Sequence, residues 1–279
     1  MESNKEYDFP MKGIHRHVSE YIRSLPDLSG KVVLDIPCGD GRASYEFLKK
    51  NAEVKSFDLF PDFIVLDDAK AEYADLADPL PLAEESVDYI ICQEGIEHVP
   101  NQLKVLEEFN RVLKKGGVLL ITTPNYSNLR SRMANFFLES DYWKRMPPTE
   151  IDSIWFAENE SSKLYFGHLF LLGVQRFKSL LTFAGFSPSL EIKTDTSNTS
   201  FLLGLLLYPL LVVVTLLSNM IYRGENGHIE LSQRRDILWE RVKLNLSPKT
   251  LFNKHIFWVL HKEFSRDEVV AKLKRMHRK

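Results

Sequence analysis

The first 125 residues alternate short apolar runs with segments of helical spacing, and this alternation limits the fold more than any other feature. Residues 14–25 carry apolar side chains at helical spacing, and residues 31–36 then form a short apolar run. A strand with one face in water would alternate apolar and polar residues, whereas a strand buried on both faces has a continuous apolar run. The alternation therefore predicts an α/β fold, with a parallel sheet covered by helices on both faces.

The same pattern predicts further elements along the chain. The expected strands are 31–36, 54–59, either 63–69 or 70–76, 87–93, 118–125 and 189–194. The expected helices are 14–25, 43–50, 101–117 and 171–186. We expect Gly116 and Gly117 to end the third of these helices, because glycine commonly follows the last helical turn. Residues 126–166 have no clear period, and we interpret them as an insertion over the strand ends.

A glycine-rich loop follows the first strand, in the sequence VVLDIPCGDG at 32–41. Glycine lets the backbone approach a ligand, and the start of the next helix presents unpaired N–H groups. Gly39 and Gly41 suit this purpose, with Asp35 at the end of the strand. A dinucleotide-binding loop needs a third glycine, and Ser44 stands at that position. NAD binding is therefore the weaker interpretation.

The loop resembles the glycine-rich motif of class I S-adenosylmethionine (SAM)-dependent methyltransferases, usually written Asp/Glu-x-Gly-x-Gly-x-Gly. Pro37 stands where the first glycine of that motif is usual, and proline supplies no N–H. The resemblance implies a Rossmann-like methyltransferase sheet of seven strands. Residues 255–262 look like its last strand, which pairs antiparallel beside the sixth. In that family the acid at the position of Asp35 lies near the amino group of the methionine moiety.

Further landmarks of the family follow in order. Asp58 matches the acid that accepts the two ribose hydroxyls, and Asp75 matches the acid that recognises the adenine amino group. The sequences DPLPLAEESVDYIICQEGIEHV and LEEFNRVLKKGGVLLITTPN resemble the fourth and fifth strand blocks. The resemblance implies a cofactor-binding set of Asp35, Pro37, Cys38, Gly39, Gly41, Asp58, Leu59, Asp75, Leu76 and Gln93. Four ordered landmarks favour SAM binding over an α/β protein without this cofactor.

A group of metal-binding residue types follows the fourth strand, where the transferred methyl group should lie. At the start of a helix Glu94, Glu97 and His98 would share a face, and two oxygens with one nitrogen suit a divalent ion. The spacing is similar to the metal site of ubiquinone-pathway O-methyltransferases and of small-RNA 2′-O-methyltransferases, in which a later histidine completes the site. His168 occupies a comparable place. We therefore expect Mg²⁺ or a similar ion on Glu94, Glu97, His98 and His168, holding a substrate hydroxyl and lowering its pKa.

Two other roles remain open for these residues. A Glu-His pair after the fourth strand also occurs in relatives with no known metal, where it packs the loop. Alternatively, His98 or His168 serves as a metal-free general base. His15 and His17 lie on the predicted N-terminal helix, which often caps the SAM pocket in such enzymes. Histidines at such positions are more typical of packing or of the surface than of catalysis.

From Thr196 to Tyr222 the chain has 27 positions without a charge, and residues 201–217 are almost purely apolar. This length is close to what a bilayer span requires. A single crossing would separate residues 255–262 from the sheet and place the basic end on the far side, against the positive-inside tendency. We expect a hairpin or surface helix that dips into the cytoplasmic leaflet, with Pro209 in its middle. An internal cap or dimer interface and a true transmembrane helix are the alternatives.

Three regions follow from these assignments. They are a SAM-binding core with its N-terminal cap helix at 1–200, a hydrophobic and amphipathic insertion at 201–254, and the last strand with a basic tail at 255–279. The formal net charge is −2, but residues 223–279 hold 14 Lys/Arg against 7 Asp/Glu. This basic end favours contact with anionic head groups, and the acidic body argues against a nucleic-acid enzyme. The two cysteines, Cys38 and Cys92, and the polar N-terminus favour a cytoplasmic location.

The expected function is SAM-dependent O-methylation of a lipid-linked, isoprenoid or saccharide acceptor at or near the membrane. One alternative is a soluble small-molecule methyltransferase acting on nitrogen or carbon. The other is a SAM-binding module without catalysis. The sequence leaves the oligomeric state open.

Overall fold

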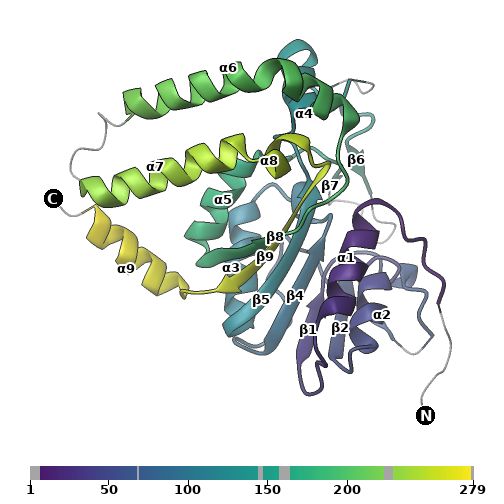
Figure 1. Cartoon of the computed structure of the whole chain (residues 1–279). Helices are drawn as coiled ribbons and strands as arrows, with labels where there is room; N and C mark the ends of the chain where they lie inside the picture. The colour runs from purple at the N-terminus through teal and green to yellow at the C-terminus, as the bar shows by residue number, and fades with distance from the viewer. Residues whose placement is uncertain (1–6, 68, 144–146, 157–163, 223–228, 278–279) are drawn as a thin grey trace.

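The computed structural model describes residues 7–67, 69–143, 147–156, 164–222 and 229–277. Parts of the predicted insertion 126–166 and the last two residues of the basic tail lie outside these ranges. Within them, seven strands form one sheet in the order β3-β2-β1-β4-β5-β9-β8 (Figure 1). The strands are β1 (Val32–Asp35), β2 (Glu53–Asp58), β3 (Ala71–Tyr73), β4 (Val87–Gln93), β5 (Leu113–Pro124), β8 (Phe186–Glu191) and β9 (His255–Lys262).

The first five strands of this sheet are parallel, and β9 runs antiparallel between β5 and β8. Helices α1 and α2 cover one face, and α3 and α5 cover the other. The helices are α1 (Gly13–Ser24), α2 (Arg42–Leu48), α3 (Gln102–Val112), α4 (Leu129–Leu138), α5 (Val174–Phe183), α6 (Asn198–Tyr222), α7 (Leu231–Leu246), α8 (Pro248–Phe252) and α9 (Arg266–Met276), with short 3-10 turns η1 (Pro61–Phe63) and η2 (Ile96–His98). The α/β fold with helices on both faces is confirmed.

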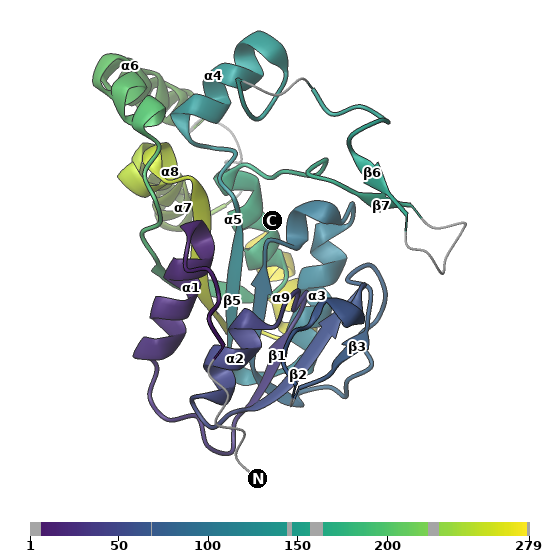
Figure 2. The same ribbon diagram turned by 90° about the vertical axis from the view of Figure 1, so that its right-hand side faces the viewer.

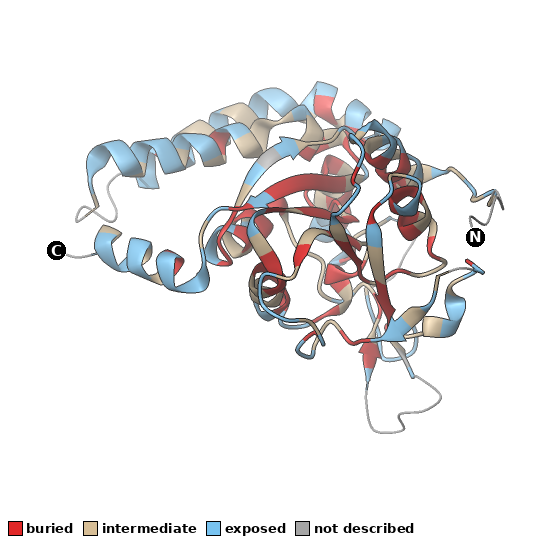
Figure 3. Ribbon diagram, turned by 90° about the horizontal axis from the view of Figure 1, so that it is seen from below, coloured by how far each residue is buried: buried red, intermediate tan, exposed pale blue. Residues whose placement is uncertain are grey.

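Burial of the sheet on both faces explains why the strands have continuous apolar sequences. Successive residues of a strand point to opposite faces. In β4, Ile90 packs in the same core cluster as Phe109 of α3, whereas Ile91 packs in the cluster that contains Phe47 of α2. All four side chains are fully buried, as the red strands of Figure 3 indicate for the sheet as a whole. Each face therefore needs its own apolar residue at every step of the strand.

The predicted helix over 101–117 is wrong at its C-terminal end. Helix α3 stops at Val112, and β5 begins with Leu113, which is buried and pairs with Val87. The next paired residue of β5 is Val118, so residues 114–117 bulge out of the ladder. Gly116 has a positive φ of 74°, which fits a bulge rather than a helix end. Burial of Leu113 in the sheet therefore outweighs the helical propensity of the lysines that follow it.

Other element boundaries differ by a few residues from the sequence prediction. Of the two alternatives for the third strand, residues 70–76 contain the observed β3. The other alternative, 63–69, contains no strand among its described residues, and its first residue, Phe63, ends the 3-10 turn η1. β8 begins at Phe186, three residues before the predicted start. It begins there because Phe186 pairs with Lys262 at the end of β9.

The insertion after β5 contains α4 and a two-stranded ribbon of β6 (Ile154–Trp155) and β7 (Tyr165–Phe166). Figure 2 shows this ribbon at the end of the sheet, on the side where the parallel strands finish. The sequence predicted an insertion in this place but no elements within it. The short ribbon and the polar start of α4 give too little periodicity for such a prediction.

Residues 198–222 form one continuous surface helix, α6, with Pro209 inside it. The helix runs beside α7 and also contacts α4 and α8 (Figure 1). Only Ser200, Gly204 and Asn219 of α6 are buried. Within the described ranges, α6 is the one helix that is long and apolar enough to cross a membrane by length and composition, with a mean hydropathy of 2.5.

Candidate active site

A cavity of about 670 Å³ lies at the edge of the sheet where β1, β2 and β4 end. This volume is in the range of small-molecule and cofactor sites. Open α/β sheets bind ligands outside the carboxyl ends of their strands, so the position is the expected one. Nine of the ten residues predicted to bind the cofactor line this cavity: Asp35, Pro37, Cys38, Gly39, Asp58, Leu59, Asp75, Leu76 and Gln93.

The two glycines of the loop have different structural roles. Gly39 has a φ of 53° and lies in the cavity wall, where a Cβ would meet nothing within 4 Å. Gly41 has a φ of 85° and precedes α2, but it is not part of the wall. A Cβ on Gly41 would lie 2.8 Å from Cγ1 of Ile64, in the chain that crosses over the loop. Gly39 therefore leaves room for a ligand, whereas Gly41 leaves room for the side chains of Ile64 and Leu66.

Asp58 ends β2 with its carboxylate already held in place. Its Oδ2 accepts a hydrogen bond from the Gly39 amide at 2.8 Å, and its Oδ1 accepts one from the Phe60 amide at 2.9 Å. Beyond β3, Oδ1 of Asp75 accepts a hydrogen bond from the Ala77 amide at 2.7 Å. Backbone donors thus fix two carboxylates on the wall of one cavity.

Asp35 is buried at the end of β1, and its Oδ2 accepts a hydrogen bond from the Ser44 hydroxyl at 2.6 Å. Burial raises the pKa of Asp35 to about 7, although the bond from Ser44 opposes this shift. The nearby carboxylate of Asp58 raises the pKa further. A cationic ligand group beside Asp35 would therefore favour its ionised form.

Helix α1 contributes a residue that the sequence interpretation left aside. His15 lines the cavity, and its Nδ1 is hydrogen-bonded to the side-chain amide of Gln93. His17, two positions along the helix, instead bonds Asp195 at 3.0 Å. Helical spacing could have separated the two histidines. Two positions on a helix are about 200° apart, so His15 and His17 point to different faces. Ile14, the neighbour of His15, is buried.

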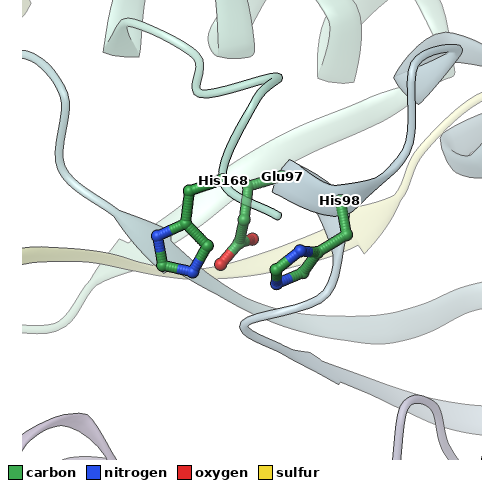
Figure 4. A group of neighbouring side chains, drawn as sticks. All are labelled: Glu97, His98 and His168. Carbon is green, nitrogen blue, oxygen red and sulfur yellow. The ribbon is translucent and has the colours of Figure 1, made fainter. Parts of the chain in front are cut away.

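Three of the four predicted metal ligands come together after β4. One ligand atom each from Glu97, His98 and His168 lies within 4.8 Å of the others. Figure 4 shows the Glu97 carboxylate between the two imidazole rings. Glu97 is fully buried, and its Oε2 accepts a hydrogen bond from the Thr123 hydroxyl at 3.0 Å. Within the described part of the chain, its Oε1 has no hydrogen-bond partner.

The environment of His98 suits a neutral imidazole. Its Nδ1 lies 2.8 Å from the carbonyl oxygen of Phe166, and a carbonyl only accepts, so Nδ1 carries the proton. Burial lowers the pKa of His98 below its usual value. Nε2 therefore carries the lone pair, as a metal ligand or a base requires.

Glu94 lies outside this group, contrary to the set expected from the sequence. It has a positive φ of 51°, and its Oε2 lies 3.5 Å from Nε2 of His255 at the start of β9. Burial raises the pKa of Glu94 to about 7. His255 was missed in the sequence, although an antiparallel last strand places its first residue at the ligand-binding edge. Glu94 lines the cavity, so it faces the same ligand space as His98.

Apolar side chains from two segments form the far wall of the cavity. Phe60 and Phe63 come from the segment after β2, and Leu164, Tyr165 and Phe166 come from the ribbon strand β7 and the residue before it. The rings of Phe60 and Tyr165 are 6.4 Å apart, so the two segments meet. The cavity thus has an acidic side and an apolar side.

Comparison with known proteins supports the same interpretation. A family model described as a methyltransferase domain matches residues 27–185. The ubiquinone biosynthesis O-methyltransferase of Xanthomonas oryzae pv. oryzae is 30% identical over 130 residues, which cover 42% of this chain and 54% of that protein. The enzyme of that name from Paraburkholderia phymatum is 33% identical over 138 residues, covering 46% of this chain and 59% of that protein. The chain spans about half the length of the curated relatives it matches.

Solved structures share the fold at low sequence identity. A putative SAM-dependent methyltransferase from Listeria monocytogenes has a TM-score of 0.51 and 10% identity, covering 90% of this chain and 99% of that one. A putative methyltransferase solved in complex with the Trm112 activator of Haloferax volcanii has a TM-score of 0.50 and 16% identity, covering 90% and 91%. The strand order, the cavity and the family match agree. The chain belongs to the class I SAM-dependent methyltransferases.

Proposed function

We propose that this chain transfers a methyl group from SAM to an oxygen atom of an amphiphilic acceptor. One observation supports this most directly. A single cavity combines fixed carboxylates at the ends of β1 and β2 with His98, the member of the Glu97, His98 and His168 group that lines it, and with an apolar far wall. The first feature suits a cationic nucleoside, the second suits a hydroxyl, and the third suits a hydrocarbon group.

SAM supplies a methyl group on a positively charged sulfur when it is bound. In this proposal the carboxylate of Asp58 accepts hydrogen bonds from the ribose hydroxyls, and Asp75 contacts the adenine amino group. Asp35 stabilises the positively charged amino group, which keeps its own carboxyl ionised. Transfer is an in-line displacement, so the main task of these residues is to fix the cofactor relative to the acceptor.

In this proposal the acceptor hydroxyl is held at the group after β4, and it loses its proton to solvent as its oxygen takes the methyl group. Glu97, His98 and His168 would hold a divalent ion, which supplies Lewis acidity to the bound oxygen. The fit rests on the open Oε1 of Glu97 and on a histidine whose lone pair lies on Nε2. Because Glu94 lies outside the group, one carboxylate and two imidazoles remain, and this set suits a borderline ion such as Zn²⁺ or Mn²⁺ as well as Mg²⁺.

The proposed acceptor is lipid-linked, an isoprenoid or a lipid-carried saccharide, on the cytoplasmic face of a membrane. The apolar wall of the cavity and the exposed helix α6 support this class. The names of the two relatives, ubiquinone biosynthesis O-methyltransferase, agree with an oxygen acceptor. We further propose that residues 201–222 provide a peripheral or monotopic membrane contact.

The test uses purified full-length protein with methyl-labelled SAM and an extracted lipid fraction. We expect SAM to bind, and label to enter the lipid fraction as a methyl ether. Chelator should lower the rate, Mg²⁺, Mn²⁺ or Zn²⁺ should restore it, and His168→Asn should abolish the metal response while SAM still binds. SAM binding without transfer would identify a SAM-binding module, and label on nitrogen or carbon would overturn the oxygen acceptor.

A further inference from the structure

The apolar surface of the molecule extends beyond α6 to the end of α4. We propose that these two helices together form one membrane-seated surface, with α6 lying in the plane of the bilayer and the aromatic end of α4 inserted beside it. We call it the α4–α6 surface and define it as α6 together with Phe136, Phe137 and Trp143. The inference rests on the proposed membrane contact of residues 201–222 and adds a second element and an orientation to it.

Helix α6 exposes large apolar side chains along its whole length. Leu206 and Ile221 are 76% and 78% exposed, and only 11% of the most apolar window is buried. The exposed set is Phe201, Leu202, Leu205, Leu206, Tyr208, Leu210, Val213, Val214, Leu217, Met220, Ile221 and Tyr222. A helix that is apolar on all sides is typical of a protein interior or a membrane, and α6 is not in the interior.

The C-terminal end of α4 and the residues after it also expose aromatic side chains. Phe136 and Phe137 are 78% and 61% exposed, and Trp143 is 40% exposed. The rings of Phe137 and Trp143 are 5.9 Å apart, so they form one cluster. Helices α4 and α6 are in contact, and Figures 1 and 2 both show them at the same end of the molecule. The ring N–H of Trp143 favours the interface between hydrocarbon and head groups, whereas the two phenylalanine rings suit the hydrocarbon itself.

Helix α6 contacts the domain near its start and again in its second half, which favours a position along the domain over one across a bilayer. Near its start, the Ser200 hydroxyl accepts a hydrogen bond from the Arg130 amide at 3.0 Å. A Cβ on Gly204 would lie 2.5 Å from the ring of Phe252, so α6 packs closely on α8. Further along, Thr215 accepts a hydrogen bond from the Asn245 side chain of α7 at 2.9 Å. These contacts support the in-plane orientation of α6.

Charge supports a bilayer as the occupant. Helices α4 and α6 themselves contain no acidic residue, and the acidic residues beside the aromatic cluster are Glu139 and Asp141, after the end of α4. Residues 223–279, which include the neighbouring helix α7, hold 14 Lys/Arg against 7 Asp/Glu, so anionic head groups are attracted to this part of the chain. A partner protein would need only one side of α6, whereas its apolar residues point in several directions.

If α6 lies in the plane of the bilayer, the cavity lies near the membrane surface. Thr196, just before α6, pairs with Asn253, two residues before the start of β9. β9 starts beside Pro124 at the end of β5, so α6 departs from the same edge of the sheet that holds the cavity. An acceptor anchored in the leaflet would then present its head to the cavity without leaving the membrane.

The test measures sedimentation of the full chain with vesicles of phosphatidylcholine and phosphatidylglycerol. The variants are Phe136→Ser with Phe137→Ser on α4, and Leu205→Ser with Leu206→Ser on α6. The matched control is Leu48→Ser with Phe183→Ser, which removes exposed apolar residues of α2 and α5. We expect each of the first two pairs to lower the vesicle partition coefficient at least about 10-fold, since two large side chains lose apolar burial. The control should bind like the wild type, and all variants should keep SAM binding.

A second measurement reads the orientation from spin labels at Leu206→Cys and Leu217→Cys. These positions are eleven residues apart, so they share one helix face and differ by about 16 Å along the axis. The native Cys38 and Cys92 are buried, but Cys38 lines the cavity, so labelling of the protein without an added cysteine is the control. We expect equal depths of immersion for a helix in the membrane plane, whereas a crossing helix would give depths about 16 Å apart.

The outcomes separate this inference from the proposed function. If the Phe136→Ser, Phe137→Ser variant binds vesicles as well as the wild type, α4 is not part of the membrane-binding surface. The proposed contact through 201–222 would still stand. Unequal depths would overturn the in-plane orientation. A wild type that ignores vesicles but dimerises through α6 would show that the surface joins two copies, and would overturn the membrane contact in both proposals. The proposed methyl transfer is tested by a separate assay, so these vesicle results neither support nor contradict it.

Discussion

The two glycines of the cofactor loop allow a sharp test, because the structure assigns them different tasks. Gly41→Ala places a Cβ in the left-handed region, at a φ of 85°, and 2.8 Å from Cγ1 of Ile64. The backbone penalty is about 1–2 kcal/mol. Forcing extra volume against packed side chains adds about 1–3 kcal/mol. We therefore expect Gly41→Ala to lose about 2–5 kcal/mol of folding stability.

Gly39→Ala is the matched comparison. Its φ of 53° carries a similar backbone penalty, but its Cβ meets nothing within 4 Å. The new methyl group would instead occupy ligand space, because Gly39 lies in the cavity wall. Gly39→Ala should therefore lose about 1–2 kcal/mol of stability. It should also lower SAM affinity more than Gly41→Ala does.

Thermal unfolding followed by circular dichroism, without SAM, measures the first effect. At about 2–4 °C per kcal/mol for a chain near this size, Gly41→Ala should melt about 4–20 °C below wild type. Titration calorimetry with SAM at 20 °C, where both variants are folded, measures the second. Equal melting temperatures for the two variants would refute the reasoning. So would weaker SAM binding by Gly41→Ala than by Gly39→Ala.

Three further changes probe the site and the core. Asp58→Asn should lower SAM affinity at least about 10-fold in calorimetry, because one amide oxygen cannot replace two carboxylate oxygens that both accept backbone N–H groups. Asp35 has its pKa raised from 3.8 to about 7, so the folded state binds this proton more tightly. Stability of the SAM-free wild type should therefore fall as pH rises from about 4 to 7 and then level off. Asp35→Asn should be more stable than wild type in denaturant titrations at pH 8, and the two should converge toward pH 4. Phe177→Ala should lose about 3–5 kcal/mol in urea unfolding, because this buried ring stacks on Trp258 at 5.3 Å.

The parallel half of the fold was predictable because its signals are local. Continuous apolar strands such as β4 require two buried faces, and the sequence shows this directly. The gathering of the candidate cofactor residues at one cavity was predictable for a similar reason, since strands that end at one edge bring their next residues together. Asp35 and Asp58 illustrate this, because each ends its strand and both line the cavity.

The parts of the site and fold that the sequence did not predict depend on contacts between segments far apart in the chain. Glu94 was expected with Glu97 on one helical face, but its backbone turns to a φ of 51° and directs it to His255. No spacing rule within one segment predicts a partner 161 positions away in the sequence. His168 lies beside Glu97 and His98 in the structure, and it entered the expected set through the resemblance to a family. The surface position of α6 was expected, whereas the aromatic end of α4 had no periodic signal.

The position of β9 between β5 and β8 has a consequence for biosynthesis. At about 5–20 residues per second, the ribosome needs several seconds to make the chain from the end of β8 at Glu191 to the end of β9 at Lys262. During that interval α6 is synthesised, while the sheet still has two unpaired edges where β9 will insert. The most apolar helix is therefore made before the hydrogen-bonding ladder of the sheet is complete. The last strand must then insert between two strands that are already synthesised.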